Sequence, residues 1–499
     1  MKAQSIGKRI SLKKGSMTLE ILIAFAVLIF CISAVISLSF GNQSVSIDSE
    51  TNNEAIGIAK KIIEDARKNS RQDYASVKTT LSNITSGGLT YNKTLSVDDL
   101  TECLKIATST VSWTSSPTRT QKIEFSTYLS DITGATSLGG DCILSTPTSN
   151  WDNPQRFASD TFSPGKPTAI DVLNKVAYIG QDKTPYLAIA DTNVATQGQN
   201  SGIFVTITNG FIANGVINDI DVINKIDASG NVKKYAFAAM NTTTKQLQVI
   251  DVTDIHKPIS KALISLSSCV AGSTPQGWVV YYYGDRLYLT TRYTAGPEFH
   301  IFNVSDPTSP TEIGSGSCKG TYLDDTVEDM VVKDQIIAGV KRRFVYMATD
   351  EDDKELRVLE VTGDVVTEMT IANKDLLGIQ DGASVFSVGN KLYFGRQSTS
   401  GSDFYVFDIT NPLAVLPTLG QVDIGTGVTG IRISGKYAFI STPKVNKEFQ
   451  VWNISNLSSI TNIATYNFGN IVSQGLDYEP DFIYATGQST PNFQILYSP

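Results

Sequence analysis

Histidine and closely spaced cysteine pairs are scarce in this 499-residue chain. His256 and His300 are its two histidines, and none of its five cysteines is spaced as Cys-x-x-Cys. A structural zinc site takes four such ligands, and a Ser-His-Asp set needs a histidine beside the nucleophile. The sequence therefore predicts no metal site, no cofactor and no catalytic residue, and we expect the protein not to be an enzyme.

Clusters of basic residues are missing beyond the first fifteen positions. Those fifteen contain five Lys or Arg and no acid, and the remainder has 36 basic against 49 acidic residues, a formal charge of −13. Neutralising phosphates takes clustered Lys and Arg, so we expect no nucleic-acid partner for the body of the chain. Its acidity is typical of a soluble, extracytoplasmic domain.

The apolar residues are gathered first in one segment. Ile21 to Phe40 are twenty residues without a charge. At about 1.5 Å per residue they span about 30 Å, the thickness of a bilayer's hydrocarbon core. The basic flank precedes the segment, which predicts a membrane-spanning helix over 16–42 with its N-terminus in the cytoplasm.

The residues just before this segment form a motif. Residues 13–20 read Lys-Lys-Gly-Ser-Met-Thr-Leu-Glu and resemble the cleavage motif of type IV prepilins and pseudopilins. The resemblance implies that a prepilin peptidase cuts after Gly15 and that the new N-terminus, Ser16, is methylated. The Glu20 carboxylate would then pair with a neighbouring subunit's amine during filament assembly. Members of the family often have Phe where this chain has Ser16, and the alternative is an uncut signal anchor.

Residues 43–148 resemble the stalk of a minor pilin. Apolar residues recur at helical spacing over 43–70, and alternating segments at 104–113 and 120–129 flank a turn at 115–118. We expect a helix that continues from the membrane segment and packs on a small β-sheet. The apolar face of this helix comprises Ile47, Ala55, Ile58, Ile62, Ile63 and Ala66.

A short strand ending in a polar residue recurs seven times in the rest of the chain, at intervals of 44 to 60 residues. Two strands precede each copy, and a fourth follows most copies. Four antiparallel strands per repeat are typical of a propeller blade, so we predict a seven-bladed β-propeller over 149–499. The repeat resembles the LVIVD type. The copies are Leu187–Asp191, Leu247–Asp251, Phe299–Asn303, Leu356–Glu360, Phe404–Asp408, Phe449–Asn453 and Phe493–Tyr497.

The last copy ends the chain at its third strand. Residues 154–162 resemble the entry to a fourth strand, so we expect them to complete that blade and close the ring. The predicted architecture is therefore mainly β: a leader over 1–15, a membrane helix over 16–42, a stalk over 43–148 and the propeller.

Four cysteines lie outside the apolar segment. Cys103 with Cys142, and Cys269 with Cys318, are the natural disulfide pairs, and the alternative is four buried thiols. The second pair occupies equivalent loops of neighbouring repeats.

Two acidic groups suggest chemistry but lack a ligand spacing. The run 350–353 and the cluster of Asp324, Asp325, Glu328 and Asp329 do not follow the Asp-x-Asp-x-Asp-Gly pattern, so we interpret both as solvated turns. His300 is expected on the surface or packed, and His256 exposed. Second-to-third and fourth-to-first loops share one face of a propeller, and we expect the binding face there.

These features suggest a minor pilin-like subunit that displays a propeller for adhesion or recognition. Its partners would be the prepilin peptidase, other pilin subunits, the cytoplasmic membrane before assembly, and an extracellular protein or glycan at the cell surface. One alternative is a minor pseudopilin or assembly-priming subunit of a type II secretion or DNA-uptake machine. Another is a surface-tethered, lactonase-like propeller enzyme.

Overall fold

The computed structural model describes residues 16–101, 104–116, 119–131, 150–227, 229–266, 274–292, 294–314, 319–397, 400–469, 473–479 and 481–499. The chain divides into two compact units, residues 1–99 with 104–131, and residues 100–103 with 132–499. Several predicted site residues lie outside the described set, and their roles stay predictions. They are Gly15, Cys103, Cys142, Cys269, Cys318 and the side chains of Ser16 and Glu20.

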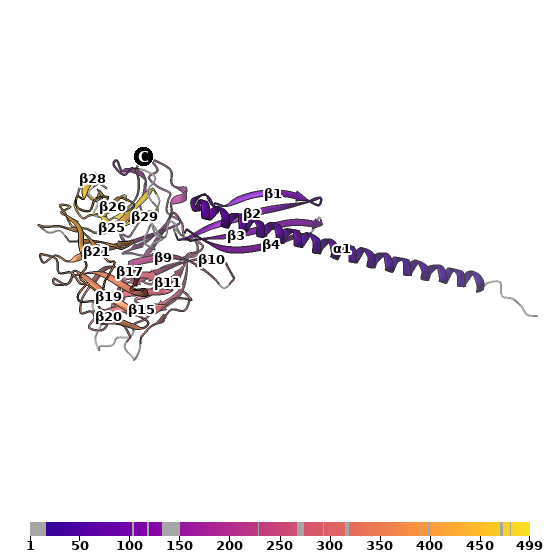
Figure 1. Ribbon diagram of the computed structural model, residues 1–499, viewed down its shortest axis with the longest axis horizontal. Helices are drawn as coiled ribbons and strands as arrows, with labels where there is room; N and C mark the ends of the chain where they lie inside the picture. Colours follow the sequence, from indigo (N-terminus) through magenta and orange to yellow (C-terminus); the bar gives the residue numbers. More distant parts are fainter. Residues whose placement is uncertain are drawn as a thin grey trace, which may run out of the picture. The chain divides into compact units, whose positions relative to one another are not determined.

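One unbroken helix, α1 (Ser16–Gln72), runs through the first unit (Figure 1). No helix among the described residues has both the length and the apolar character needed to cross a membrane. The segment predicted to do so, residues 16–42, falls in α1, and most of its side chains lie outside the described residues.

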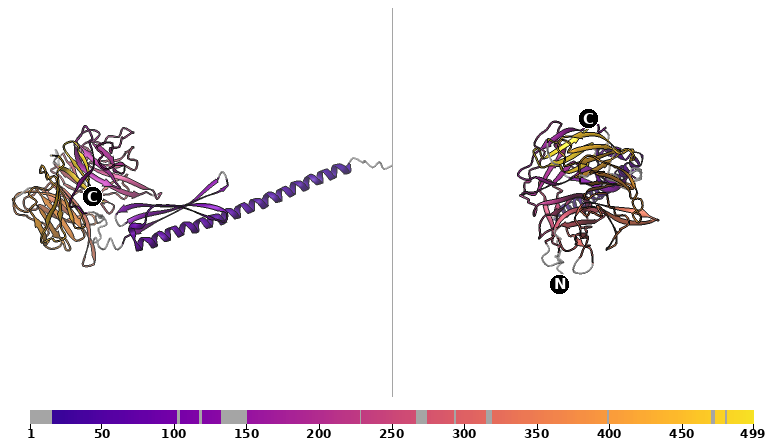
Figure 2. Two further views of the ribbon diagram at one scale, coloured as in Figure 1. Left: turned by 90° about the horizontal axis from the view of Figure 1, so that it is seen from above. Right: turned by 90° about the vertical axis from the view of Figure 1, so that its left-hand side faces the viewer.

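A four-stranded antiparallel sheet lies along the C-terminal part of α1 (Figure 2). A short 3-10 helix, η1 (Tyr74–Ser76), leads from α1 to it. The predicted hairpin at 104–113 and 120–129 is confirmed and extends further in both strands. The strands, in their order across the sheet, are β1 (Thr80–Ser86), β2 (Leu89–Thr101), β3 (Leu104–Ser116) and β4 (Arg119–Ser130).

The core of this unit forms where α1 meets the sheet. Ala55 and Ala59 pack against Val111 and Trp113, which is 1% exposed. Ala66 lies about two turns further along α1 and packs against a second group of buried residues. These alanines are spaced by four and seven residues, so they share one helix face, and their small side chains let the sheet approach closely. The predicted apolar face is confirmed from Ala55 to Ala66, and the side chain of Ile47 lies outside the described residues.

The second unit consists of seven antiparallel sheets, one three-stranded and six four-stranded in the described residues. The three-stranded sheet comprises β6 (Pro167–Leu173), β7 (Val176–Gln181) and β8 (Leu187–Asp191), followed by η2 (Thr192–Val194). The second sheet comprises β9 (Ile217–Ile226), β10 (Val232–Met240), β11 (Leu247–Asp251) and β12 (Ile259–Ile264). The third comprises β13 (Gln276–Tyr283), β14 (Arg286–Arg292), β15 (Phe299–Asn303) and β16 (Thr311–Glu312). The fourth comprises β17 (Val327–Ile337), β18 (Val340–Thr349), β19 (Leu356–Thr362) and β20 (Val365–Glu368). The fifth comprises β21 (Gly382–Val388), β22 (Lys391–Arg396), β23 (Phe404–Asp408) and β24 (Thr418–Val422). The sixth comprises β25 (Gly430–Ser434), β26 (Tyr437–Ser441), β27 (Phe449–Asn453) and β28 (Thr461–Tyr466). The last comprises β29 (Ser473–Glu479), β30 (Phe482–Gly487), β31 (Phe493–Tyr497) and β5 (Gln155–Asp160).

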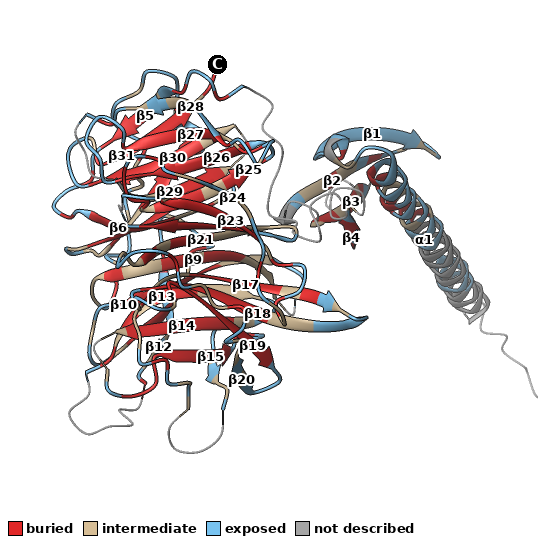
Figure 3. Ribbon diagram, turned by 60° about the vertical axis from the view of Figure 1, so that its left-hand side comes forward, coloured by how far each residue is buried: buried red, intermediate tan, exposed pale blue. Residues whose placement is uncertain are grey.

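The first strands of these sheets contact one another in cyclic order. β6 contacts β9, the series continues through β13, β17, β21, β25 and β29, and β29 contacts β6. This is the arrangement of a β-propeller, and the β part of the predicted fold class is confirmed. All seven predicted repeat strands are third strands of sheets, and most of their residues are buried. Figure 3 shows this for β23, β27 and β31, whereas β1 of the first unit is exposed.

The last sheet joins the two ends of the second unit. β31 pairs with β5 in antiparallel register, with Phe493 opposite Asp160 and Ile495 opposite Ala158. This confirms the prediction that residues 154–162 supply the fourth strand of the last repeat. The two ends are also tied by side chains, since Asn492 Oδ1 accepts a hydrogen bond from Phe162 N at 3.0 Å.

In five of the seven sheets of the second unit, a carboxylate or amide just before the third strand ties a connection to its sheet. The side-chain oxygen accepts the backbone N–H of an apolar residue in the segment leading to the next sheet, at 2.7 to 3.3 Å. These acceptors are buried, so each supplies a partner that water does not. The acceptors and donors are Gln246 with Leu266, Glu298 with Leu323, Glu355 with Leu376, Glu448 with Phe468, and Asn492 with Phe162.

Glu355 also faces a buried guanidinium. Arg396 Nη2 lies 3.3 Å from Glu355 Oε1, and the two side chains are 1% and 0% exposed. We expect Glu355→Ala to lower the free energy of unfolding by about 3–5 kcal/mol, because it leaves the Arg396 charge buried without its partner. Urea unfolding measures this difference.

The matched control is Asp352→Ala, an exposed acid in the same connection between β18 and β19. It should change stability by less than about 0.5 kcal/mol. Equal effects of the two substitutions would contradict the role assigned to the Glu355–Arg396 pair.

Candidate functional site

A polar pocket of about 440 Å³ lies where three connections of the second unit meet. The β14–β15 connection, the segment between β16 and β17 and the β18–β19 connection line it. These are second-to-third and fourth-to-first loops, so the prediction that such loops share a face is confirmed at this point. We call it the acid pocket; its lining residues are Thr291, Arg292, Thr294, Ala295, Glu298, Asp324, Asp325, Thr326 and Asp350.

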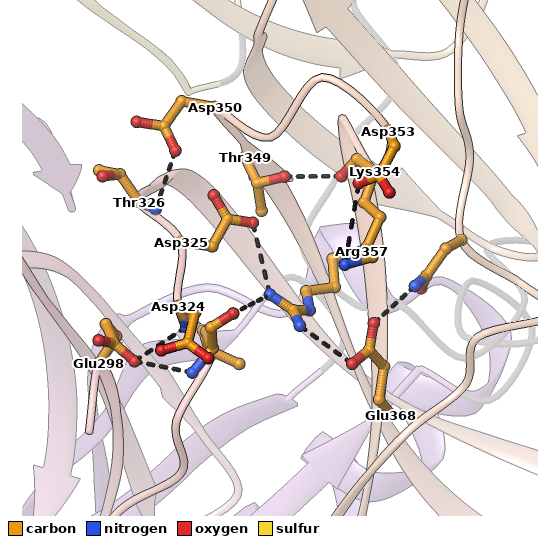
Figure 4. Close-up of polar contacts among 12 residues, drawn as sticks. Glu298, Asp324, Asp325, Thr326, Thr349, Asp350, Asp353, Lys354, Arg357 and Glu368 are labelled. Carbon is orange, nitrogen blue, oxygen red and sulfur yellow. Dashed lines mark hydrogen bonds and ion pairs between the residues drawn. The ribbon is translucent and has the colours of Figure 1, made fainter. Parts of the chain in front are cut away.

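Backbone hydrogen bonds position two of the acids (Figure 4). Glu298 Oε2 accepts from Leu323 N at 2.7 Å and from Asp324 N at 3.3 Å. Asp350 Oδ1 accepts from Thr326 N at 2.9 Å, and Asp350 N donates to Thr326 O at 3.1 Å. The walls of the pocket are therefore fixed to one another by main-chain groups.

Asp325 lies at the centre of this group (Figure 4). Its side chain is 0% exposed, and its Oδ2 lies 3.4 Å from Arg357 Nη1. Oδ1 is buried and accepts no hydrogen bond from a described donor. Burial and then the adjacent Asp350 carboxyl raise the pKa of Asp325 to about 8. Burial opposes ionisation of Asp350 as well, but its contacts with Asp325 and Thr326 lower the pKa of Asp350.

The two arginines nearby are already engaged. Arg357 Nη1 donates to Leu323 O at 2.7 Å, and its Nη2 lies 3.0 Å from Glu368 Oε2. Arg292 lies 3.0 Å from Glu328 Oε1 and 4.0 Å from the Trp278 ring centroid. The Arg292 charge also contributes to lowering the pKa of Asp350. The lining residues of the pocket comprise four acids and one arginine.

The interpretation of the acidic groups as solvated turns is wrong for three residues. Glu328 lies on β17 and forms an ion pair with Arg292. Asp325 is buried beside Arg357, which comes 32 residues later in the chain and gave no signal at that spacing. Asp329 lies on β17 and accepts hydrogen bonds from Val385 N and Ser384 Oγ of the next sheet at 2.9 and 2.8 Å. Asp352 and Asp353 are exposed, as predicted.

The histidines lie as expected. His300 is 4% exposed, with Nδ1 2.7 Å from Glu312 Oε1 and Nε2 3.0 Å from Pro297 O. His256 is exposed. In the part of the chain that the structure describes, no group of three or more His, Cys, Asp or Glu side chains is arranged to hold a metal ion.

A second set of acids lies on the first strands, and the sequence analysis missed it. Asp171 Oδ2 accepts from Val222 N at 2.6 Å, and Asp219 Oδ2 accepts from Val280 N at 2.8 Å. Burial raises the pKa of Asp171 well above its usual value, and it raises that of Asp219 to about 7. The signal was an acid between apolar residues in a first strand, as in Ile170-Asp171-Val172.

Comparisons with known proteins identify one repeat. The LVIVD repeat model matches residues 427–468, which contain the whole sheet β25–β28. This match and the cyclic arrangement of sheets make the second unit a β-propeller domain. No curated protein matches the chain.

Solved structures similar to the chain include several propellers. The Cps50 (Swd1) β-propeller domain of Myceliophteria thermophila is 11% identical, with a TM-score of 0.45 over 68% of this chain and 99% of that one. BamB from Moraxella catarrhalis is 12% identical, with a TM-score of 0.39 over 70% and 98%. A putative 6-phosphogluconolactonase from Bacteroides fragilis is 13% identical, with a TM-score of 0.40 over 60% and 85%. Likenesses at this level carry no argument about function.

The raised pKa of Asp219 ties stability to pH. Burial raises its pKa from the usual 3.8 to about 7, so the folded state holds this proton to higher pH than the unfolded chain. The stabilising contribution is therefore complete below about pH 4 and is lost as pH rises through 7. We expect Asp219→Asn to remove this part of the pH dependence.

Melting temperatures of the wild type and the variant between pH 5 and 8 test this. The wild type should lose its advantage over Asp219→Asn as pH rises. Asp254→Asn, at an exposed position in the connection after β11, is the control and should leave the wild-type profile unchanged. Parallel profiles for the wild type and Asp219→Asn would contradict the assignment.

Proposed function

We propose that the chain is a minor pilin-like subunit of a type IV pilus-type filament that displays its propeller for recognition. The observation that carries this proposal is the continuity of α1. The helix runs without a break from the Ser-Met-Thr-Leu-Glu motif at 16–20 into the face that packs on β1–β4. One helix thus joins the segment proposed to pack into a filament to a small folded domain.

The uncharged run from Ile21 to Phe40 supports a membrane location before assembly, followed by display at the cell surface. Cleavage after Gly15 would give Glu20 a free amine partner on a neighbouring subunit, which a carboxylate at the edge of an apolar helix requires. In this proposal the disulfides Cys103–Cys142 and Cys269–Cys318 form after export.

We further propose that the seven sheets are seven blades of one closed ring. The cyclic contacts of the first strands and the β31–β5 pairing support this. The recognition role is supported by the acid pocket, whose lining combines hydroxyl and carboxylate side chains on one face of the domain. We propose binding rather than catalysis, with an extracellular protein as the target.

Processing is tested at the leader. We expect mass spectrometry of the mature protein to find an N-terminus at Ser16, carrying a methyl group. Gly15→Val should block cleavage, because the peptidase of the resembled family cuts after this glycine, while Gly7→Val in the same leader should not. A mature protein that starts at Met1 in the wild type would exclude the prepilin role.

Assembly is tested at Glu20. We expect Glu20→Ala to leave cleavage intact and to reduce the protein in sheared filaments at least about tenfold, because the proposed ion pair inside the apolar filament core is lost. Glu50→Ala, at an exposed acid further along α1, is the control. Wild-type protein that is processed but absent from sheared filaments would favour a pseudopilin or assembly-priming subunit.

A further inference from the structure

We infer that the acid pocket binds the ammonium group of a lysine side chain on a protein partner. The inference deepens the proposed recognition role of the propeller and names its ligand. It concerns binding alone, so it can fail while the filament proposal stands, and the reverse also holds.

The first argument is charge. Four acids line the pocket, Glu298, Asp324, Asp325 and Asp350, against one lining arginine, Arg292, which is paired with Glu328. The Asp325 side chain is fully buried, and no described donor reaches its Oδ1. A buried carboxylate oxygen in this state is costly unless a donor or a proton satisfies it.

The second argument concerns the proton shared by the carboxyl groups of Asp325 and Asp350, whose place a ligand can take. The adjacent carboxyls of Asp325 and Asp350 move each other's pKa in opposite directions, which is the behaviour of two acids that share one proton. An ammonium group brings both donor hydrogens and a positive charge. It can therefore take the place of that proton between the two carboxyls.

The third argument separates ammonium from guanidinium. One oxygen of each carboxylate is already used: Asp325 Oδ2 by Arg357, Asp350 Oδ1 by Thr326 N, and Glu298 Oε2 by Leu323 N. A guanidinium fork prefers both oxygens of one carboxylate, whereas an ammonium donates separately to several acceptors. The arrangement therefore suits lysine better than arginine.

The surroundings favour a protein over a sugar. The neighbouring connection carries Leu377 and Ile379, which are 94% and 74% exposed. It is tied to the β18–β19 connection, because Glu355 Oε2 accepts a hydrogen bond from Leu376 N, and the Asp350 charge helps to raise the pKa of Asp381. Exposed aliphatic side chains on a connection tied to one wall of an acidic pocket match a lysine flanked by apolar residues on a partner surface.

The experiment measures binding of two peptides to the full chain in detergent by calorimetry at pH 7. The probes are N-acetyl-Leu-Lys-Leu-amide and its counterpart with norleucine, which keeps the aliphatic chain and lacks the amine. We expect the lysine peptide to bind at least about tenfold more tightly. Calorimetry in buffers of different ionisation enthalpy should show release of close to one proton per bound peptide.

Variants locate the effect. Asp350→Asn should weaken lysine-peptide binding at least about tenfold, and Asp325→Asn should abolish proton release. The matched control is Asp353→Asn, at an exposed acid of the same connection outside the pocket, which should change neither. Asp350 is itself exposed, so its substitution is expected to fold, and the melting temperature checks this.

Three results would overturn the inference. Equal binding of the lysine and norleucine peptides would show that the ammonium group does not contribute to binding. Tighter binding of glucosamine than of the lysine peptide would assign the pocket to an amino sugar, and stabilisation by calcium chloride that Asp350→Asn removes would assign it to a metal ion.

Discussion

Buried apolar residues in the segments between sheets have backbone N–H groups that need acceptors, because water does not satisfy them there. In five repeats of the second unit, one side chain just before the third strand meets this need. Glu298, Glu355 and Glu448 each reach one such N–H group. The spacing of neighbouring sheets depends on these contacts, and so does the acid pocket, since the bond that orders Leu323 also sets the position of Asp325 beside Arg357.

The elements with local signals were predictable from the sequence. The helical spacing of small residues predicted the buried face of α1 at Ala55 and Ala66. The recurring apolar segments predicted the third strand of each of the seven sheets in the second unit. Closure by residues 154–162 followed from counting strands. Each of these depends on the periodicity of a short stretch of chain.

The acid pocket escaped prediction because its chemistry depends on distant partners. The sequence around Asp325 is typical of a solvated turn. In the structure Asp325 is buried against Arg357, which lies on β19. Asp219 and Asp329 are held by N–H groups of the adjacent sheet. The acceptors before five of the third strands are Gln, Glu or Asn at equivalent positions of the repeat. Their role becomes clear only with the connection whose N–H group they accept.

The pairing of β31 with β5 has a consequence for how the protein is made. Phe162 and Asn492, which are joined by hydrogen bonds, lie 330 residues apart. The ribosome therefore finishes all other strands of the domain before it supplies the partner of β5. If the chain is exported as proposed, the helix enters the membrane long before that strand exists. The incomplete domain must then wait outside the cell membrane, open at one edge, until its last residues have been translocated.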